Sequence, residues 1–141
     1  MMEWLKNIDP VALWGAVVST VLAIREIAKT RTKIEIGHNF TSSPEIGNEI
    51  IIRNISASPI IITYWELIWI KQRFLMCKKI RAEGPDEFNS DINLAEHSST
   101  SLTFAGQYHF DCGWKSLNGA KIYLKLHIAG KKWPRYYKVY G

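Results

Sequence analysis

The sequence is poor in cysteine, and its two cysteines form no recognisable motif. Only Cys77 and Cys112 occur among the 141 residues, and there is no CxxC pair. Small secreted domains that depend on disulfides carry many more thiols for their length. We therefore expect both cysteines to be reduced and structural. The alternative, for an extracellular domain, is a single disulfide bond between them.

Signatures of catalysis and of nucleotide binding are also missing. The sequence contains no GxSxG elbow, no GxxxxGK[ST] loop and no GxGxxG turn, which are the patterns that would indicate such sites. The four histidines are scattered, whereas metal sites usually contain at least one close pair of ligands. The one dense group, residues 109–112 (HFDC), fits an ordinary loop better than a metal site. We expect neither an enzyme nor a cofactor.

Charge is absent from one long stretch near the N-terminus. Residues 10–24 (PVALWGAVVSTVLAI) carry no charged side chain. Asp9 precedes them as a natural helix N-cap, and Pro10 fits the first helical position, where a backbone N–H is not needed. Charged residues return at Arg25, so we predict a helix from Pro10 to about Thr30.

This predicted helix is apolar nearly all round, as membrane spans are. Only Ser19 and Thr20 are polar in the uncharged stretch, and both hydroxyls can bond back to the helix backbone. The stretch covers about 22 Å of a hydrocarbon core about 30 Å thick, and a snorkelling Arg25 adds to it. We predict a transmembrane or deeply inserted helix. The alternatives are a helix buried in a soluble assembly or against its own domain, and a cleaved signal peptide.

Basic residues follow the apolar stretch on its C-terminal side. They are Arg25, Lys29, Arg31 and Lys33, against one lysine in the N-terminal flank. The positive-inside rule then predicts a single-pass protein of the cell (inner) membrane, with its N-terminus outside and the rest of the chain in the cytoplasm. The four basic side chains are expected to contact anionic lipid. The alternative is a solvated linker.

Small residues share one face of the predicted helix. Ala12, Ala16, Ser19 and Ala23 recur at helical spacing, and Gly15 borders them. Small side chains let helices pack closely in lipid, so we predict a homo-oligomer formed through this face. The alternative is that the stripe reflects only how common alanine is in helices.

From Lys33 onward the apolar residues recur with a period of two, which is the pattern of strands. Strands are expected at residues 33–40, 49–55, 60–71, 73–80, 101–105, 121–128 and 133–140, with loops at 82–100 and 106–119 and a short strand inside the second loop at 108–110. Residues 60–71 are the most apolar and are expected at the centre of a sheet. Asn54 begins the acceptor pattern Asn-Ile-Ser, but we expect it to support the turn after its strand.

These patterns predict two domains and a mainly β fold. Residues 1–31 are expected to form the membrane anchor with its basic flank, and residues 32–141 an antiparallel, immunoglobulin-like β-sandwich of about seven strands. A small closed barrel is the alternative.

A second basic group lies within eleven residues of the β-rich part. It consists of Lys71, Arg73, Lys78, Lys79 and Arg81. Together with the net charge of +5, it favours an anionic partner. Lipid is favoured over nucleic acid, because aromatic residues for base stacking are few around it. The interpretation that we favour over both partners is an edge strand whose lysines prevent sheet-to-sheet aggregation.

Three functions fit these observations. The favoured one is a membrane-anchored binding module whose β-domain meets a protein partner or ligand at the cytoplasmic membrane face. The second is an oligomeric effector that perforates or perturbs the bilayer, as toxins do. The third is a soluble, basic, nucleic-acid-binding β-domain.

Overall fold

The computed structural model describes residues 9–29, 31–73, 76–85 and 91–141, apart from the side chains of Lys29 and Arg73. The chain divides into two compact units, Met1–Arg31 and Thr32–Gly141. We refer to the second unit as the β-domain.

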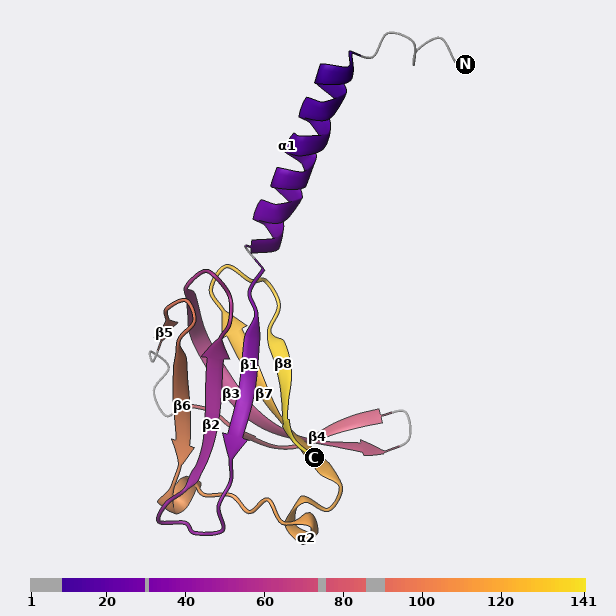
Figure 1. Cartoon of the computed structure of the whole chain (residues 1–141). Coiled ribbons are helices and arrows are strands. Elements are labelled where there is room, and N and C mark those ends of the chain that lie inside the picture. The colour runs from indigo at the N-terminus through magenta and orange to yellow at the C-terminus, as the bar shows by residue number, and fades with distance from the viewer. Residues whose placement is uncertain (1–8, 30, 74–75, 86–90) are drawn as a thin grey trace. The chain divides into compact units, whose positions relative to one another are not determined.

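The helices and strands follow one another in a simple order (Figure 1). They are α1 (Pro10–Lys29), β1 (Ile34–Asn39), β2 (Asn48–Asn54), β3 (Ile60–Arg73), β4 (Met76–Glu83), β5 (Ile92–Leu94), β6 (Ser99–Phe104), the 3₁₀ turn η1 (Gly106–Tyr108), α2 (Trp114–Leu117), β7 (Ala120–Ile128) and β8 (Arg135–Tyr140).

Helix α1 begins as its sequence predicts. The carboxylate of Asp9 accepts a hydrogen bond from the backbone N–H of Val11 at 3.0 Å, which satisfies one of the free donors of the first turn. Ser19 and Thr20 donate their hydroxyls to backbone carbonyls one turn earlier, at 2.7 and 2.8 Å. The predicted start of the helix and the predicted backbone bonds of its two hydroxyls are both confirmed.

The β-domain is a sandwich of two antiparallel sheets (Figure 1). One sheet has the order β1-β2-β6, and the other has the order β4-β3-β7-β8, with β5 pairing with the start of β3. The described part of the chain has eight strands in two separate sheets, which confirms the predicted sandwich instead of the closed barrel. The immunoglobulin-like detail stays a prediction.

The core lies between the two sheets and is made by alternate residues of the central strands. Ile50 and Ile52 of β2 face Leu67 of β3 and the inward residues of β7, and all of these are buried. Strand β7 alternates buried and more exposed positions over its whole length, as its sequence predicts. Strand β3 lies inside its sheet between β4 and β7, which confirms its central position.

Two buried asparagines fix the ends of β2. At its start, Asn48 donates its amide to the carbonyl of Phe110 at 2.5 Å and accepts the N–H of Thr41 at 2.9 Å. At its end, Asn54 donates to the carbonyls of Ser58 and Ala95, both at 2.9 Å. The prediction that Asn54 supports the following turn is confirmed.

The sequence-based strand limits are wrong in three places. Strand β4 covers Met76–Glu83 instead of 73–80, because β3 continues to Arg73. Strand β5 lies inside the segment expected as a loop, and at three residues it is too short to show a period. No strand forms at 108–110, because η1 occupies its start and Phe110 turns into the core.

Candidate functional site

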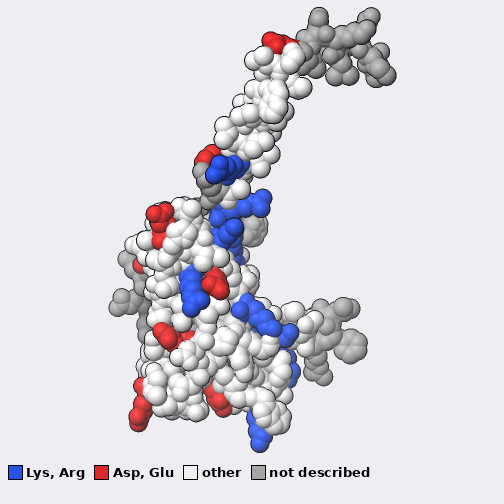
Figure 2. All heavy atoms as spheres, in the orientation of Figure 1, with Lys and Arg blue, Asp and Glu red and all other residues white. Residues whose placement is uncertain are grey.

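The first candidate site is the surface of α1, which is exposed on every side. The stretch Pro10–Ala28 is long and apolar enough to cross a membrane, and none of it is buried. Its 19 residues span about 28 Å, close to the hydrocarbon core of about 30 Å. Figure 2 shows uncharged surface along the helix between charged groups at its two ends.

The predicted helix–helix face is open in the structure. Ala12, Gly15, Ala16, Ser19 and Ala23 are all exposed on α1. A Cβ atom added at Gly15 would meet nothing within 4 Å. Space for a second helix is therefore present along this face.

The basic flank continues from the end of α1 into the first strand. Arg25 and Arg31 are exposed, and so is Lys33 at the start of the β-domain. The side chain of Lys29 is outside the described part of the chain. Glu26 is the single acidic residue between Arg25 and Lys33, so the flank keeps a net positive charge.

The second candidate site is the basic group on β3 and β4. Strand β4 forms an edge of its sheet, and its side chains are exposed along nearly its whole length. Lys71 and Lys78 are directly opposite each other across the two strands, an arrangement in which like charges repel. With Lys79 and Ile80 they line a hollow of about 530 Å³. The side chain of Arg73 is not among those described.

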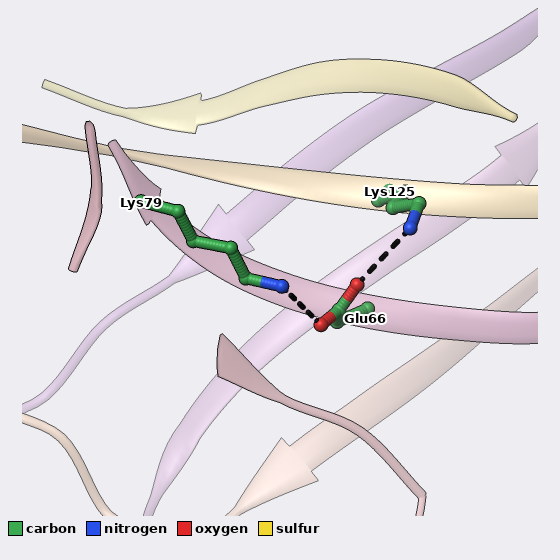
Figure 3. A network of polar contacts seen from close by, with 3 residues as sticks. All are labelled: Glu66, Lys79 and Lys125. Carbon is green, nitrogen blue, oxygen red and sulfur yellow. Dashed lines mark hydrogen bonds and ion pairs between the residues drawn. The ribbon is translucent and has the colours of Figure 1, made fainter. Parts of the chain in front are cut away.

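Two members of this group have acidic partners. Lys79 donates to one carboxylate oxygen of Glu66 at 2.6 Å, and Lys125 of β7 donates to the other at 3.3 Å (Figure 3). Arg81 pairs with Glu83 and lies over the ring of Trp69, 5.0 Å from its centre. Among the described members of the group, Lys79 and Arg81 therefore have their positive charges partly neutralised by acidic side chains.

Glu66 is held in its charged form by these contacts. Its side chain is only 13% exposed. Burial raises the pKa of this carboxyl group, but the hydrogen bonds and positive charges of Lys79 and Lys125 outweigh burial, so the pKa lies below its usual value. The carboxylate binds β3 to both of its neighbouring strands across the outer face of the sheet.

The third candidate is an open hollow of about 500 Å³ at the end of the β-domain that carries α2. Its lining includes His38, Phe40, Tyr140, Asp111 and Cys112. The rings of the first three lie 4.8–5.5 Å apart, in tilted or edge-on contacts. The three aromatic side chains therefore pack against one another, and they join the end of β1 and the residue after it to β8.

The loop at 109–112 uses its polar groups for structure. His109 Nε2 lies 2.9 Å from the carbonyl of Thr41. Asp111 accepts hydrogen bonds from Ser116 and from the N–H of Gly113, which lower its pKa and hold the start of α2. Within the described ranges, no three His, Cys, Asp or Glu side chains are grouped to hold a metal ion.

Cys112 is unsuited to act as a nucleophile at neutral pH. Burial, and next the charge of Asp111, raise the pKa of its thiol to about 11. Since the thiolate is the reactive form, nearly all of this residue is then unreactive. Cys77 is also a free thiol, and it is exposed.

Sequence reasoning missed Glu66 and the end of the β-domain where β7 turns into β8. Glu66 is one acidic residue within an apolar strand, and its partners come from strands that are distant in sequence. The β7–β8 loop has a visible signal, Lys131-Lys132-Trp133, which was not recognised as a group.

No model of a known protein family matches the chain, and no curated protein matches it. Function is therefore inferred from the chain's own chemistry.

Proposed function

We propose that this protein is a single-pass, membrane-anchored binding module whose β-sandwich works at the cytoplasmic face of the cell (inner) membrane. The observation that carries the proposal is α1: a helix of membrane-spanning length, uncharged from Pro10 to Ile24, with no buried face. In water such a helix would leave large side chains such as Trp14 and Val11 more than 70% exposed. Transfer into lipid removes that apolar surface from water.

The mechanism we propose is tethering. The anchor confines the β-domain to the membrane and so raises its effective concentration for a protein partner or ligand there. The β-domain suits this role because all residues of its core belong to the β-domain itself.

The proposed orientation follows from charge. Arg25, Lys29, Arg31 and Lys33 are on the side of the helix that leads into the β-domain, and positive flanks stay in the cytoplasm. The two free thiols support the same side, since the cytoplasm keeps thiols reduced. The flank would then contact anionic lipid, at about 1 kcal/mol for each charge near the surface.

We further propose that the protein self-associates through the small-residue face of α1. A perforating effector is the second candidate, and the open face around Gly15 and Ser19 favours it to the extent that helices assemble there. Membrane depolarisation on expression, lost when residues 1–30 are removed, would distinguish it from a tethered module.

Nucleic-acid binding is less well supported by the geometry. Lys79 and Arg81 are engaged with acidic side chains, which leaves fewer positive charges for phosphates. Their position on an edge strand also fits a role in preventing sheet-to-sheet pairing.

The proposal is tested by fractionating cells that express the full chain or residues 32–141 alone. We expect the full chain to stay in the membrane pellet after an alkaline wash, and the shorter chain to be soluble. Full-length protein that washes off, or that purifies without detergent as a stable monomer, would contradict the anchor.

A further inference from the structure

The loop between β7 and β8 presents a tryptophan and two lysines to solvent. Trp133 is 74% exposed, and the ammonium group of Lys132 lies 5.7 Å from the centre of its ring. Lys131 is exposed as well. The loop backbone is held by hydrogen bonds from Ala129 to Ile61 at 2.9 Å and from Lys131 to Ile128 at 3.0 Å. The backbone that carries these side chains is therefore fixed to the end of the sheet.

This loop is at the end of the β-domain where the chain arrives from the anchor. Arg135, the first residue of β8, donates a hydrogen bond to the carbonyl of Thr32 at 3.0 Å, and Thr32 is the first residue of the β-domain. The N–H of Ile55 likewise binds the carbonyl of Lys33 at 3.1 Å. Figure 2 shows basic side chains gathered at this upper end of the β-domain.

Chain connectivity keeps this end close to the anchor. Lys29 ends α1, and only two residues separate it from Thr32. Three steps of about 3.8 Å allow at most about 11 Å between these two residues. The start of the β-domain is therefore within little more than one Debye length, about 8 Å at physiological salt, of the end of α1.

The chemistry of the loop matches a membrane surface. Tryptophan is enriched at the headgroup level, where its ring is amphipathic, and lysines add attraction to anionic lipid. Among the residues that the structure describes, Lys33, Lys131, Lys132 and Arg135 provide four positive charges at this end, and Glu96 of the β5–β6 turn contributes one negative charge. The balance favours an anionic surface.

We propose that the β7–β8 loop is a second membrane contact, in which Lys131 and Lys132 bind anionic lipid headgroups and Trp133 inserts among them. This proposal rests on the anchor proposed above. Its consequence is that the β-domain is held against the bilayer at two points, and its orientation is then fixed relative to the membrane.

The chain contains a matched control for this loop. Trp114 in α2 is 80% exposed, and the ammonium group of Lys115 lies 5.6 Å from its ring centre. The pair resembles Lys132 and Trp133, but it precedes β7, whereas the β7–β8 loop follows it. It is therefore at the opposite end of the β-domain (Figure 1).

The experiment uses the full chain in vesicles of brominated phosphatidylcholine mixed with phosphatidylglycerol, and measures the share of tryptophan fluorescence that bromine quenches. Trp133→Phe removes a quenched tryptophan, so this share should fall. Trp114→Phe removes an unquenched one, so the share should rise. Replacing Lys131 and Lys132 with glutamine should lower the ratio of docked to free loops by roughly 30-fold. The quenched share should then fall at least as far as in Trp133→Phe, because an undocked Trp133 still emits.

The outcomes separate this proposal from the anchor. Trp14 on α1 reports insertion of the helix. Quenching that persists from Trp14 while Trp133→Phe behaves like Trp114→Phe overturns the loop contact and leaves the anchor intact. No quenching at all, with protein that washes off in alkali, overturns the anchor itself. Equal quenching of Trp133 in vesicles without phosphatidylglycerol overturns the recognition of anionic headgroups.

Discussion

At the scale of single residues, Glu66 is a charged side chain that connects three strands of the β-domain. Its carboxylate joins Lys79 of β4 and Lys125 of β7 to β3. We expect Glu66→Gln to lower the free energy of unfolding by about 1–2 kcal/mol, because two lysines lose a largely buried anion. Urea unfolding at neutral pH measures this loss.

Acid should remove the stabilisation by the Glu66 carboxylate from the wild-type protein as well. The pKa of Glu66 is lower in the folded state than its ordinary value of 4.5, so its stabilisation is complete above about pH 4.5 and is lost as the pH falls through the folded pKa. The difference between wild type and Glu66→Gln should therefore shrink below pH 4.5. Glu35→Gln is the control, since its pair with Arg53 is about half exposed and 3.5 Å long, and such pairs contribute about 0–1 kcal/mol. A difference that grows with acidity would contradict this account.

The roles of some polar residues could be predicted from the sequence, and the roles of others could not. Asp9, Ser19 and Thr20 act on backbone close to them in sequence, and their roles were predicted. Asn54 binds the nearby carbonyl of Ser58, which was predicted, and also the distant carbonyl of Ala95, which was not. Glu66 and Asn48 act across strands, and their partners depend on a register that is set only when the sheets assemble.

At the scale of elements, α1 offers a direct test of self-association. Replacing Ala16 and Ser19 with isoleucine fills the small-residue face, and we expect crosslinked oligomers in membranes to fall several-fold. Val18→Ile with Val21→Ile is the matched control, because these residues lie largely outside that face. Oligomer that is unchanged in the first variant, or equally reduced in the second, would contradict the proposed interface.

A second element-scale prediction concerns the glycines that precede two strands. Gly47 comes before β2 with a φ of +82°, and a Cβ atom there would lie 2.7 Å from that of Ala105 and 2.8 Å from the carbonyl of Phe104. Gly119 comes before β7 with a φ of +78° and open space around it.

The two glycines therefore separate backbone strain from steric conflict. Gly119→Ala should cost about 1 kcal/mol through its left-handed backbone alone. Gly47→Ala should cost about 2–4 kcal/mol, because β2 or β6 must also shift. Thermal unfolding of both variants measures the difference, and equal losses would show that the close approach of the chain at Gly47 is unimportant.

Elements with a strong period were predicted well, and short ones were not. Strand β7 alternates over its whole length, and β3 is apolar on both faces, so both were recognised. Strand β5 has three residues and pairs only with the start of β3, and α2 has four. Such short elements are held by their neighbours in the fold and leave little trace in local sequence.

At the scale of the whole molecule, stability should reside in the β-domain alone. All core residues fall between Ile34 and Val139, and the described part of α1 contributes none. We expect residues 32–141 to unfold cooperatively, with a free energy within about 0.5 kcal/mol of that of the β-domain in the full chain in detergent. Calorimetry or denaturant titration compares the two. Loss of cooperative unfolding in the shorter chain would show that α1 takes part in the fold.

One part of the candidate membrane site could be predicted from the sequence, and the other part could not. The anchor and its basic flank are local in sequence and were predicted from it. The placement of Lys131, Lys132 and Trp133 beside the start of β1 required the structure, because the contact between Arg135 and Thr32 joins opposite ends of the β-domain's sequence.

The unequal thiols give the chain a built-in marker of sidedness. Cys77 is exposed on β4, whereas the pKa of Cys112 is raised to about 11. A charged maleimide cannot cross a bilayer and reacts with thiolates, so at neutral pH it should modify Cys77 long before Cys112. If Cys77 is protected in intact cells and reacts once they are broken, the β-domain faces the interior, and the native sequence reports this without an added tag.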